Sequence, residues 1–497
     1  RGDLGIETGV ENLPLYMDVA NVLHDKDIMV VGGRYGLSSK NTTPAQIKSV
    51  FDFLGSRKVH HNFTIGISDD VTHLSLKIDS KFHIEEGEMN LLIYGYGSDG
   101  MVSTSKDLIK IIGDNTKNYV QGYFQYDSKK SGGVTRSHIR ISGSVIHKPY
   151  YVENAKVVVV SKDNYMYQYD ILDNIVYGGI LLLNTSLSRE DLVKSLPNKV
   201  KYLLAKKNIK FYAIDAYGLV NQLGLRNKIS TCMEVCIFEL IQVLSRKKYL
   251  SIMKNSNEKR FLSKGENVVQ ANNKVVDMAL SVLKEIDVDK KWKNLVYFED
   301  EQLSDEEVIR HLKGDTLPVS AFIDKANGVF EGGNTWREKR DIAERVPCWK
   351  SESCIQCNQC AFVCPHGVIR PFLLDKNDNE VDSVDSLFPR DVKYTIGVSY
   401  KDCTGCGLCY QTCPGKLGNK AIEMVPYDRD KFSQDDFDYL VENNINGSFK
   451  KNILNVKNTG FIAPKFEFSG SCAGCGETAY LKNLTQVFQG FELDSRK

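Results

Sequence analysis

Short apolar runs alternate with amphipathic segments over much of the chain. Runs with the length of buried strands predict strands at 27–31, 90–94, 119–124, 156–160, 179–183 and 210–215. Helical periodicity predicts helices at 44–54, 103–112, 188–196 and 230–246, with Thr42 or Thr43 as the N-cap of the first. This alternation predicts α/β layering over residues 88–305.

Eight of the 13 cysteines lie in two runs with identical spacing. Each run fits C-x2-C-x2-C-x3-C-P, in which three cysteines wrap one [4Fe–4S] cluster and the fourth binds the neighbouring cluster. We therefore expect one cluster on Cys354, Cys357, Cys360 and Cys413, and a second on Cys403, Cys406, Cys409 and Cys364.

A structural zinc site is the alternative for these runs, because C-x2-C pairs also suit tetrahedral zinc. Zinc motifs rarely carry four cysteines at this spacing with a trailing proline, and here the pattern occurs twice, so it favours iron–sulfur chemistry. Cys232 and Cys236 lie four residues apart on a predicted helix and are expected to pack in a core. Clustered cysteines in a large chain predict a reducing compartment.

A glycine-rich loop follows the strand expected at 90–94. Residues 95–100 read Gly-Tyr-Gly-Ser-Asp-Gly and precede a predicted helix, where free N–H groups can hold an anion. A tight turn without a ligand is the alternative. Lys129 and Lys130 stand in a later Gly/Ser loop and favour a second phosphate group, with an exposed polar turn as the alternative. These residues predict a phosphate-rich nucleotide of unspecified kind.

Composition and charge narrow the class of protein only slightly. The 497 residues are 42% hydrophobic and 26% charged, which predicts an ordinary globular chain with several cores. The net charge of +1 gives no electrostatic reason to expect a nucleic-acid or membrane partner. The sequence holds no apolar run of about 18 residues, the length that predicts a membrane span.

The last cysteine pair is Cys472 and Cys475, flanked by glycines. Alone, such a pair fits a redox-active pair, half of a metal site or a mobile pair. Two thiolates cannot hold a cubane cluster, so a third cluster would need two ligands beyond Lys497. Because the chain also begins at Arg1 without methionine, we expect it to be a piece of a longer polypeptide.

The order of these motifs resembles the pyruvate:ferredoxin (flavodoxin) oxidoreductase family over nearly the whole chain. The segments that carry the resemblance are 33–40, 97–100, 121–124, 126–133, 317–322, 354–366 and 470–478. Family members are thiamine-diphosphate enzymes that oxidatively decarboxylate pyruvate, form acetyl-CoA and pass electrons along [4Fe–4S] clusters. The resemblance implies a multidomain α/β fold, in which a coenzyme A domain is followed by a bacterial-type 2[4Fe–4S] ferredoxin domain.

The resemblance also implies domain boundaries and site residues. The implied segments are the end of a transketolase C-terminal-like domain (1–60), a connector (61–87), a gamma-type α/β coenzyme A domain (88–301), a linker domain (302–345), a ferredoxin domain (346–435) and the start of a thiamine-diphosphate domain (436–497). Coenzyme A-contacting positions of the family match Gly97, Ser98, Asp99, Gly100, Met101, Lys129 or Lys130, Ser230 and Asn272. Met101 and Ser230 stand where the family usually has Thr and Asn. Cys472 and Cys475 match two ligands of the family's proximal cluster.

The resemblance implies a full-length homodimer that uses thiamine diphosphate, Mg²⁺, pyruvate and coenzyme A. Ferredoxin or flavodoxin would be the electron acceptor, in the cytoplasm or a hydrogenosome-like organelle. Catalytic residues are expected outside this segment, so the chain alone should not decarboxylate pyruvate. A pyruvate:NADP⁺ oxidoreductase, another 2-oxoacid specificity and an electron-transfer protein without catalysis are the alternatives.

Overall fold

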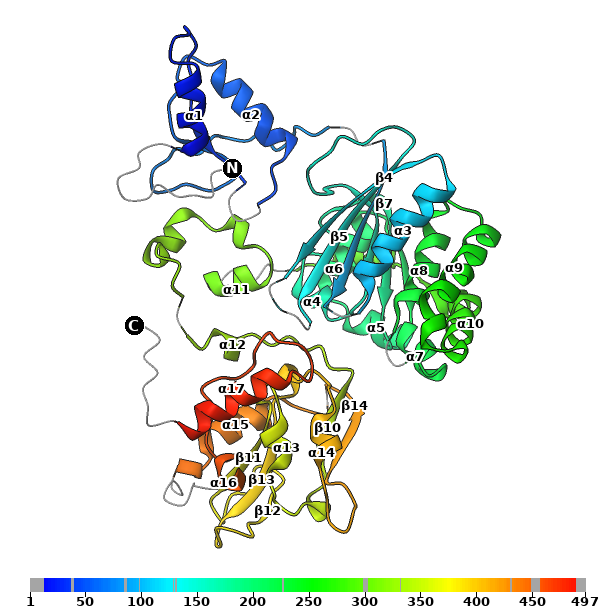
Figure 1. The fold of residues 1–497 in the computed structure, drawn as a ribbon, viewed down its shortest axis with the longest axis vertical. Helices are drawn as coiled ribbons and strands as arrows, with labels where there is room; N and C mark the ends of the chain where they lie inside the picture. The colour runs from blue at the N-terminus through cyan, green and yellow to red at the C-terminus, as the bar shows by residue number, and fades with distance from the viewer. Residues whose placement is uncertain are drawn as a thin grey trace. The chain divides into compact units, whose positions relative to one another are not determined.

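The chain folds into two compact units. The computed structural model describes residues 13–36, 40–84, 87–97, 99–127, 129, 132–225, 228–297, 303–330, 332–429, 431–447 and 456–488. One unit comprises Arg1–Tyr126 and Thr135–Phe330, and the other comprises Asp127–Val134 and Glu331–Lys497 (Figure 1). The finer division into six segments remains a prediction. None of the helices in the described ranges has the length and apolar character needed to cross a membrane.

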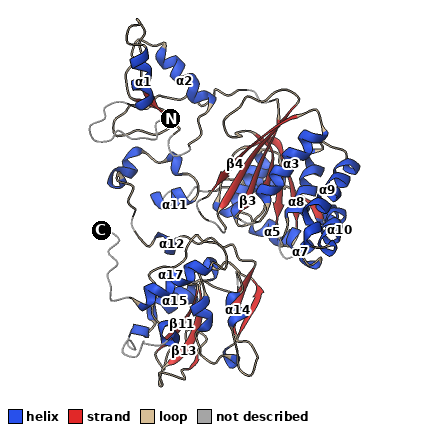
Figure 2. Cartoon of the chain, viewed as in Figure 1, coloured by secondary structure: helices blue, strands red, loops and turns tan. Residues whose placement is uncertain are grey.

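The first unit is built around a seven-stranded sheet (Figure 2). In spatial order its strands are β4 (Tyr119–Tyr126), β5 (Val134–Ser142), β3 (Met89–Tyr96), β6 (Ala155–Val160), β7 (Ile175–Asn184), β8 (Lys210–Ile214) and β9 (Leu283–Ile286). Strands β3, β6, β7 and β8 are parallel, whereas β4 with β5 and β8 with β9 are antiparallel. The expected α/β layering is confirmed, and β5 and β9 are strands that the pattern did not predict.

Helices cover the parallel strands, which explains why those strands are apolar on both faces. The helices of this part are α3 (Met101–Asn115), α4 (Tyr165–Gln168), α5 (Arg189–Ser195), α6 (Asn198–Lys206), α7 (Ala216–Gln222), α8 (Ser230–Ile241), α9 (Arg246–Phe261), α10 (Glu266–Val282) and α11 (Asp305–Arg310). One core joins side chains of β3, β5 and β6 to those of α3, α7, α8, α9 and α10. Cys232 and Cys236 are fully buried in this core, as predicted.

The segment before the sheet contains one confirmed element and one wrong prediction. Helix α2 (Pro44–Leu54) has the predicted bounds, and Thr43 forms a capping box with Gln46. Helix α1 (Pro14–Val22) precedes it, and two-residue strands β1 (Gly33–Arg34) and β2 (Phe63–Thr64) pair in parallel. The strand predicted at 27–31 is absent, because the ladder begins only at β1 and Ile28 and Met29 remain exposed.

A buried polar chain ties together the carboxyl ends of the parallel strands. Asn184, at the end of β7, donates to the carbonyl of Ser161 (3.1 Å) and accepts from the amide of Ala216 (3.0 Å). The Ser161 hydroxyl in turn donates to the Asp99 carboxylate at 2.7 Å. Asn184 therefore helps to hold the loop after β3, which carries the glycine-rich motif.

The second unit contains a repeat of strand, cysteine loop, helix and strand. Its elements are α12 (Asn334–Arg337), β10 (Arg345–Trp349), α13 (Gln359–Val363), β11 (Ile369–Leu374), β12 (Val384–Asp385), β13 (Lys393–Val398), α14 (Leu408–Thr412), β14 (Ile422–Pro426), α15 (Asp435–Asn443), α16 (Val456–Thr459) and α17 (Gly476–Val487). One copy runs from β10 through α13 to β11, and the other from β13 through α14 to β14. Strand β10 pairs with β14 and β11 pairs with β13, both antiparallel, so each pair takes one strand from each copy.

Replacing Asn184 by leucine should destabilise the first unit. Leucine has a similar shape but leaves the Ser161 carbonyl and the Ala216 amide buried without this partner. We expect a loss of about 2–4 kcal/mol in unfolding free energy, seen in calorimetry as a lower midpoint for one thermal transition. Asn255→Leu, at an exposed position of α9, is the control and should leave the midpoint within experimental error. Equal midpoints for the two variants would contradict this role of Asn184.

Candidate functional site

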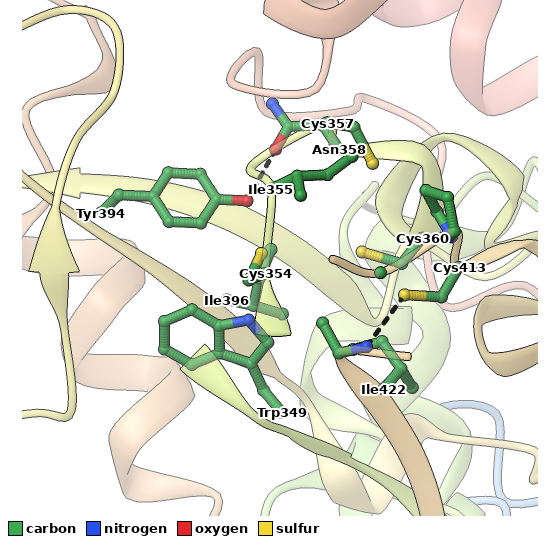
Figure 3. A pocket seen from close by; sticks show the side chains of 13 residues that line it. Trp349, Cys354, Ile355, Cys357, Asn358, Cys360, Tyr394, Ile396, Cys413 and Ile422 are labelled. Atoms are coloured by element: carbon green, nitrogen blue, oxygen red, sulfur yellow. Dashed lines mark hydrogen bonds between the residues drawn. The ribbon is translucent and has the colours of Figure 1, made fainter. Parts of the chain in front are cut away.

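Four cysteines from the two runs surround one cavity in the second unit (Figure 3). Cys354, Cys357 and Cys360 come from the first run, and Cys413 is the last cysteine of the second. The other lining residues are Trp349, Ile355, Asn358, Tyr394, Ile396, Pro414, Gly415, Ala421 and Ile422. The residues predicted from spacing for one cluster are thus brought together, including the one that lies 53 positions after Cys360 in the sequence.

Both cysteine loops use the same backbone conformation. The residues two and four places after the first cysteine have positive φ angles, at +54° for Gln356 and +60° for Asn358 in the first run. The corresponding residues of the second run are Gly405 at +66° and Gly407 at +77°. Left-handed backbone turns the loop back on itself, so that successive cysteines can face one centre. Glycine adopts it at no steric cost, whereas Gln and Asn require support.

The side chains of Gln356 and Asn358 provide this support. Gln356 donates to the carbonyl of Asp385 (2.9 Å) and accepts from the amide of Leu387 (2.7 Å). Asn358 accepts from the Tyr394 hydroxyl at 2.8 Å, a contact drawn in Figure 3, and donates to the carbonyl of residue 457 at 2.8 Å. The sequence did not predict these roles. A Gln or Asn between two cysteines of the motif looks the same whether its side chain holds the loop in place or faces water.

Backbone amides point at three of the cysteine sulfurs. Gln356 N–H donates to Cys354 Sγ and Gly405 N–H donates to Cys403 Sγ, both at 3.4 Å. Ala421 N–H donates to Cys413 Sγ at 3.3 Å, the second dashed contact of Figure 3. Such donors stabilise negative charge on sulfur, as thiolate ligands of a metal cluster require.

The second predicted set also converges. Burial raises the pKa of the Cys403, Cys406 and Cys409 thiols, that of Cys409 to about 12, and nearby Cys364 raises each of them further. Cys364 belongs to the first run, so here too the fourth cysteine comes from the other run. Thiols crowded in this way can ionise together only when a cationic centre binds them, which fits a cluster. Among the described residues, no three His, Cys, Asp or Glu side chains are placed to hold a single metal ion.

The last cysteine pair lies beside the second run. Cys472 is exposed, and Cys475 directly precedes α17. Hydrogen bonds from Thr478 hold the pKa of Cys475 below its usual value. A Cβ atom on Gly474 would lie 3.5 Å from Cys406 Cβ, so the loop between the two cysteines packs against the second cysteine loop.

Buried cations lie close to the cysteines, and sequence reasoning missed them as well. Lys482 of α17 donates to the carbonyls of Ala361 and Phe362. Burial lowers the pKa of Lys482 to about 8, an effect that Cys364 opposes. Arg370 of β11 is also buried and pairs with Glu467. Lys482 lies 118 positions after Cys364, and the sequence gives no signal that the two are close.

The glycine-rich loop occupies the carboxyl end of β3. Gly100, with φ +90°, precedes α3, and a Cβ atom there would lie 3.0 Å from Ser230 Cβ. Asp99 is buried, and its carboxylate accepts from the amides of Tyr96 (2.9 Å) and Met101 (2.8 Å). Burial raises the pKa of Asp99 to about 6. Its contacts make Asp99 a residue that shapes the loop.

The other residues predicted for this site are only partly gathered. Ser230 accepts through its carbonyl from Thr104 of α3 (3.3 Å), and Thr231 donates to the Asn272 side chain (3.2 Å). Gly97 lies in the loop and the buried Met101 follows it, within the same unit. The remaining predicted residues are Lys129, which belongs to the second unit and pairs with Glu338 at 2.6 Å, and Ser98 and Lys130, which lie outside the described residues.

Comparison with known proteins agrees with both units. A family model for pyruvate ferredoxin/flavodoxin oxidoreductase matches residues 90–282, and one for a 4Fe-4S dicluster domain matches residues 353–417. The pyruvate:ferredoxin oxidoreductase of Moorella thermoacetica is 41% identical and the pyruvate-flavodoxin oxidoreductase of Trichormus variabilis is 37% identical, each over 97% of this chain. The matches cover 42% and 43% of those relatives, so the chain spans less than half of their length. The chain belongs to the pyruvate:ferredoxin/flavodoxin oxidoreductase family.

Proposed function

We propose that the full-length protein oxidatively decarboxylates pyruvate to acetyl-CoA and CO₂, and that this chain supplies its electron-transfer module and coenzyme A domain. Relatives named for this reaction match 97% of the chain and support the proposal. The observation that carries it is the convergence of Cys354, Cys357, Cys360 and Cys413 on one cavity. Ferredoxin or flavodoxin would accept the electrons, and the protein would act as a homodimer in reducing surroundings.

The two cysteine sets would hold two [4Fe–4S] clusters. One set is Cys354, Cys357, Cys360 and Cys413, and the other is Cys403, Cys406, Cys409 and Cys364. When bound, each cluster would take up and release one electron at a time, which suits transfer from a two-electron oxidation to one-electron carriers. The amides of Gln356, Gly405 and Ala421 would stabilise the charge on sulfur.

Cys472 and Cys475 would provide two ligands of a third cluster. Contact of Gly474 with the second cysteine loop supports this role, because electrons would then pass directly between neighbouring centres. The lowered pKa of Cys475 also favours the thiolate that a metal needs. The remaining ligands, thiamine diphosphate and Mg²⁺ would belong to other parts of the full-length protein.

Coenzyme A would bind at the carboxyl edge of the seven-stranded sheet. Open parallel sheets bind ligands beyond the carboxyl ends of their strands, and the glycine-rich loop and the start of α3 lie there. Gly97, Gly100 and Ser230 would line this site, with Asn272 behind them. Asp99 would act through the shape of the loop, because its carboxylate would repel a phosphate.

Iron analysis of paired variants tests the two cysteine sets. The anaerobically prepared chain should hold about eight iron and eight sulfide atoms. Cys354→Ser, Cys413→Ser and the double variant should each lose about four iron atoms, because both cysteines serve one cluster. Cys354→Ser combined with Cys403→Ser should lose nearly all the iron.

Cys348→Ser is the matched control, since Cys348 lies in neighbouring β10 but in neither set. It should keep the full iron content. Zinc with little sulfide in the unaltered chain would contradict the electron-transfer role. If the Cys354/Cys413 double variant lost the iron of both single variants added together, the two cysteines would not serve the same cluster.

Gly100→Ala should weaken coenzyme A binding by about tenfold, because alanine is strained at φ +90° and its Cβ atom would crowd Ser230. Isothermal titration of the chain with coenzyme A measures this. Gly113→Ala, in the last turn of α3 with open space around its Cβ position, is the control and should bind normally. Unchanged affinity in Gly100→Ala would exclude the loop from the binding site.

A further inference from the structure

Two lysines cap the two short helices of the cysteine repeat in corresponding ways. Lys482 donates to the carbonyls of Ala361 and Phe362, the first two residues after Cys360. Lys420 donates to the carbonyls of the first two residues after Cys409, at 2.8 and 3.1 Å, and to the carbonyl of Cys413 at 3.0 Å. Each lysine therefore lies at the helix end that joins a cysteine of one set to a cysteine of the other.

Capping alone explains only part of this arrangement. The last carbonyls of a helix need donors, and a cation suits the negative end of the helix dipole. Both lysines meet that need. They differ in surroundings, because Lys482 is 2% exposed whereas Lys420 is only half-buried. They also differ in origin, since Lys420 belongs to the repeat and Lys482 arrives from α17, the helix that follows Cys475.

No carboxylate among the described residues pairs with the charge of Lys482. Within the described ranges its hydrogen-bond partners are carbonyl oxygens, whereas the other buried cation near Cys364, Arg370, pairs with Glu467. The two carbonyls that Lys482 contacts lie between Cys360 and Cys364, which belong to different sets. A buried charge is poorly screened, so its field reaches both cysteine sets.

We propose that Lys482 sets the reduction potentials of both clusters. This rests on the proposed function, in which the cysteines hold [4Fe–4S] clusters. When a cluster takes up one electron from a donor, no bond changes, and the cluster with its thiolates becomes one charge more negative. A nearby buried ammonium stabilises that added charge and raises the potential, since net charge is one of the factors that set cluster potentials. Lys482 would act on the clusters through its charge, without binding them. It belongs to α17, the helix that follows Cys475.

The test is a potentiometric EPR titration of the anaerobically prepared chain with dithionite as reductant. Lys482→Gln keeps N–H donors for the two carbonyls but removes the charge, and we expect both midpoint potentials to become more negative. Lys482→Arg keeps the charge and should keep potentials near those of the unaltered chain. Lys420→Gln is the matched control: it neutralises the corresponding cap, and its shift should be clearly smaller because water screens Lys420.

Each outcome has a distinct meaning. Unchanged potentials in Lys482→Gln, with full iron and sulfide, would overturn the proposal and leave the cluster assignment intact. Shifts of equal size in Lys482→Gln and Lys420→Gln would also overturn it, because they would reflect capping rather than buried charge. Should Lys482→Gln fail to load clusters, Lys482→Met is titrated. Loss of iron in both would assign Lys482 to assembly and overturn the proposal. An unaltered chain without iron would overturn the proposed function itself.

Discussion

The second unit depends on one constraint, the exchange of the fourth cysteine between the two runs. For Cys413 to reach the cavity of Cys354, Cys357 and Cys360, helices α13 and α14 must lie against each other. The strands also join the two copies, because β10 pairs with β14 and β11 pairs with β13. Neither copy could complete its cysteine set or its sheet alone. The two copies of the repeat therefore form one folding unit.

The second constraint is charge, because the second unit brings together eight thiols, five of which are buried. Burial and mutual repulsion favour the neutral thiols, so thiolates that held the proposed clusters would need compensating positive charge from the metal and from the protein. Backbone amides supply part of it in both loops, and the capping lysines supply more at the helix ends. This positive charge differs between the two helix ends, because of the two capping lysines Lys482 is buried and Lys420 is half-buried. The fold therefore gives two similar loops different electrostatic surroundings.

Short sequence motifs predicted the structure correctly where the interacting residues lie close together in a recognisable pattern. Cysteine spacing predicted that Cys354, Cys357, Cys360 and Cys413 lie together, and they line one cavity. A proline with a preceding threonine predicted α2 and its cap. Prediction from sequence failed where polar residues are buried because they pair with residues elsewhere in the chain. Strand β5 was missed because Arg140 and His138, which look like surface residues, are buried against Gln121 and Gln125 of β4. The position of Lys482 next to the first cysteine run was missed for the same reason, because its partners lie far away in the sequence.

Anomalous diffraction from crystals of the anaerobically prepared chain, recorded at the iron and zinc absorption edges, tests the central claim most directly. The account predicts two separate groups of iron, one enclosed by Cys354, Cys357, Cys360 and Cys413 and the other by Cys403, Cys406, Cys409 and Cys364. A zinc signal at these positions, or iron held by four cysteines of a single run, would contradict it.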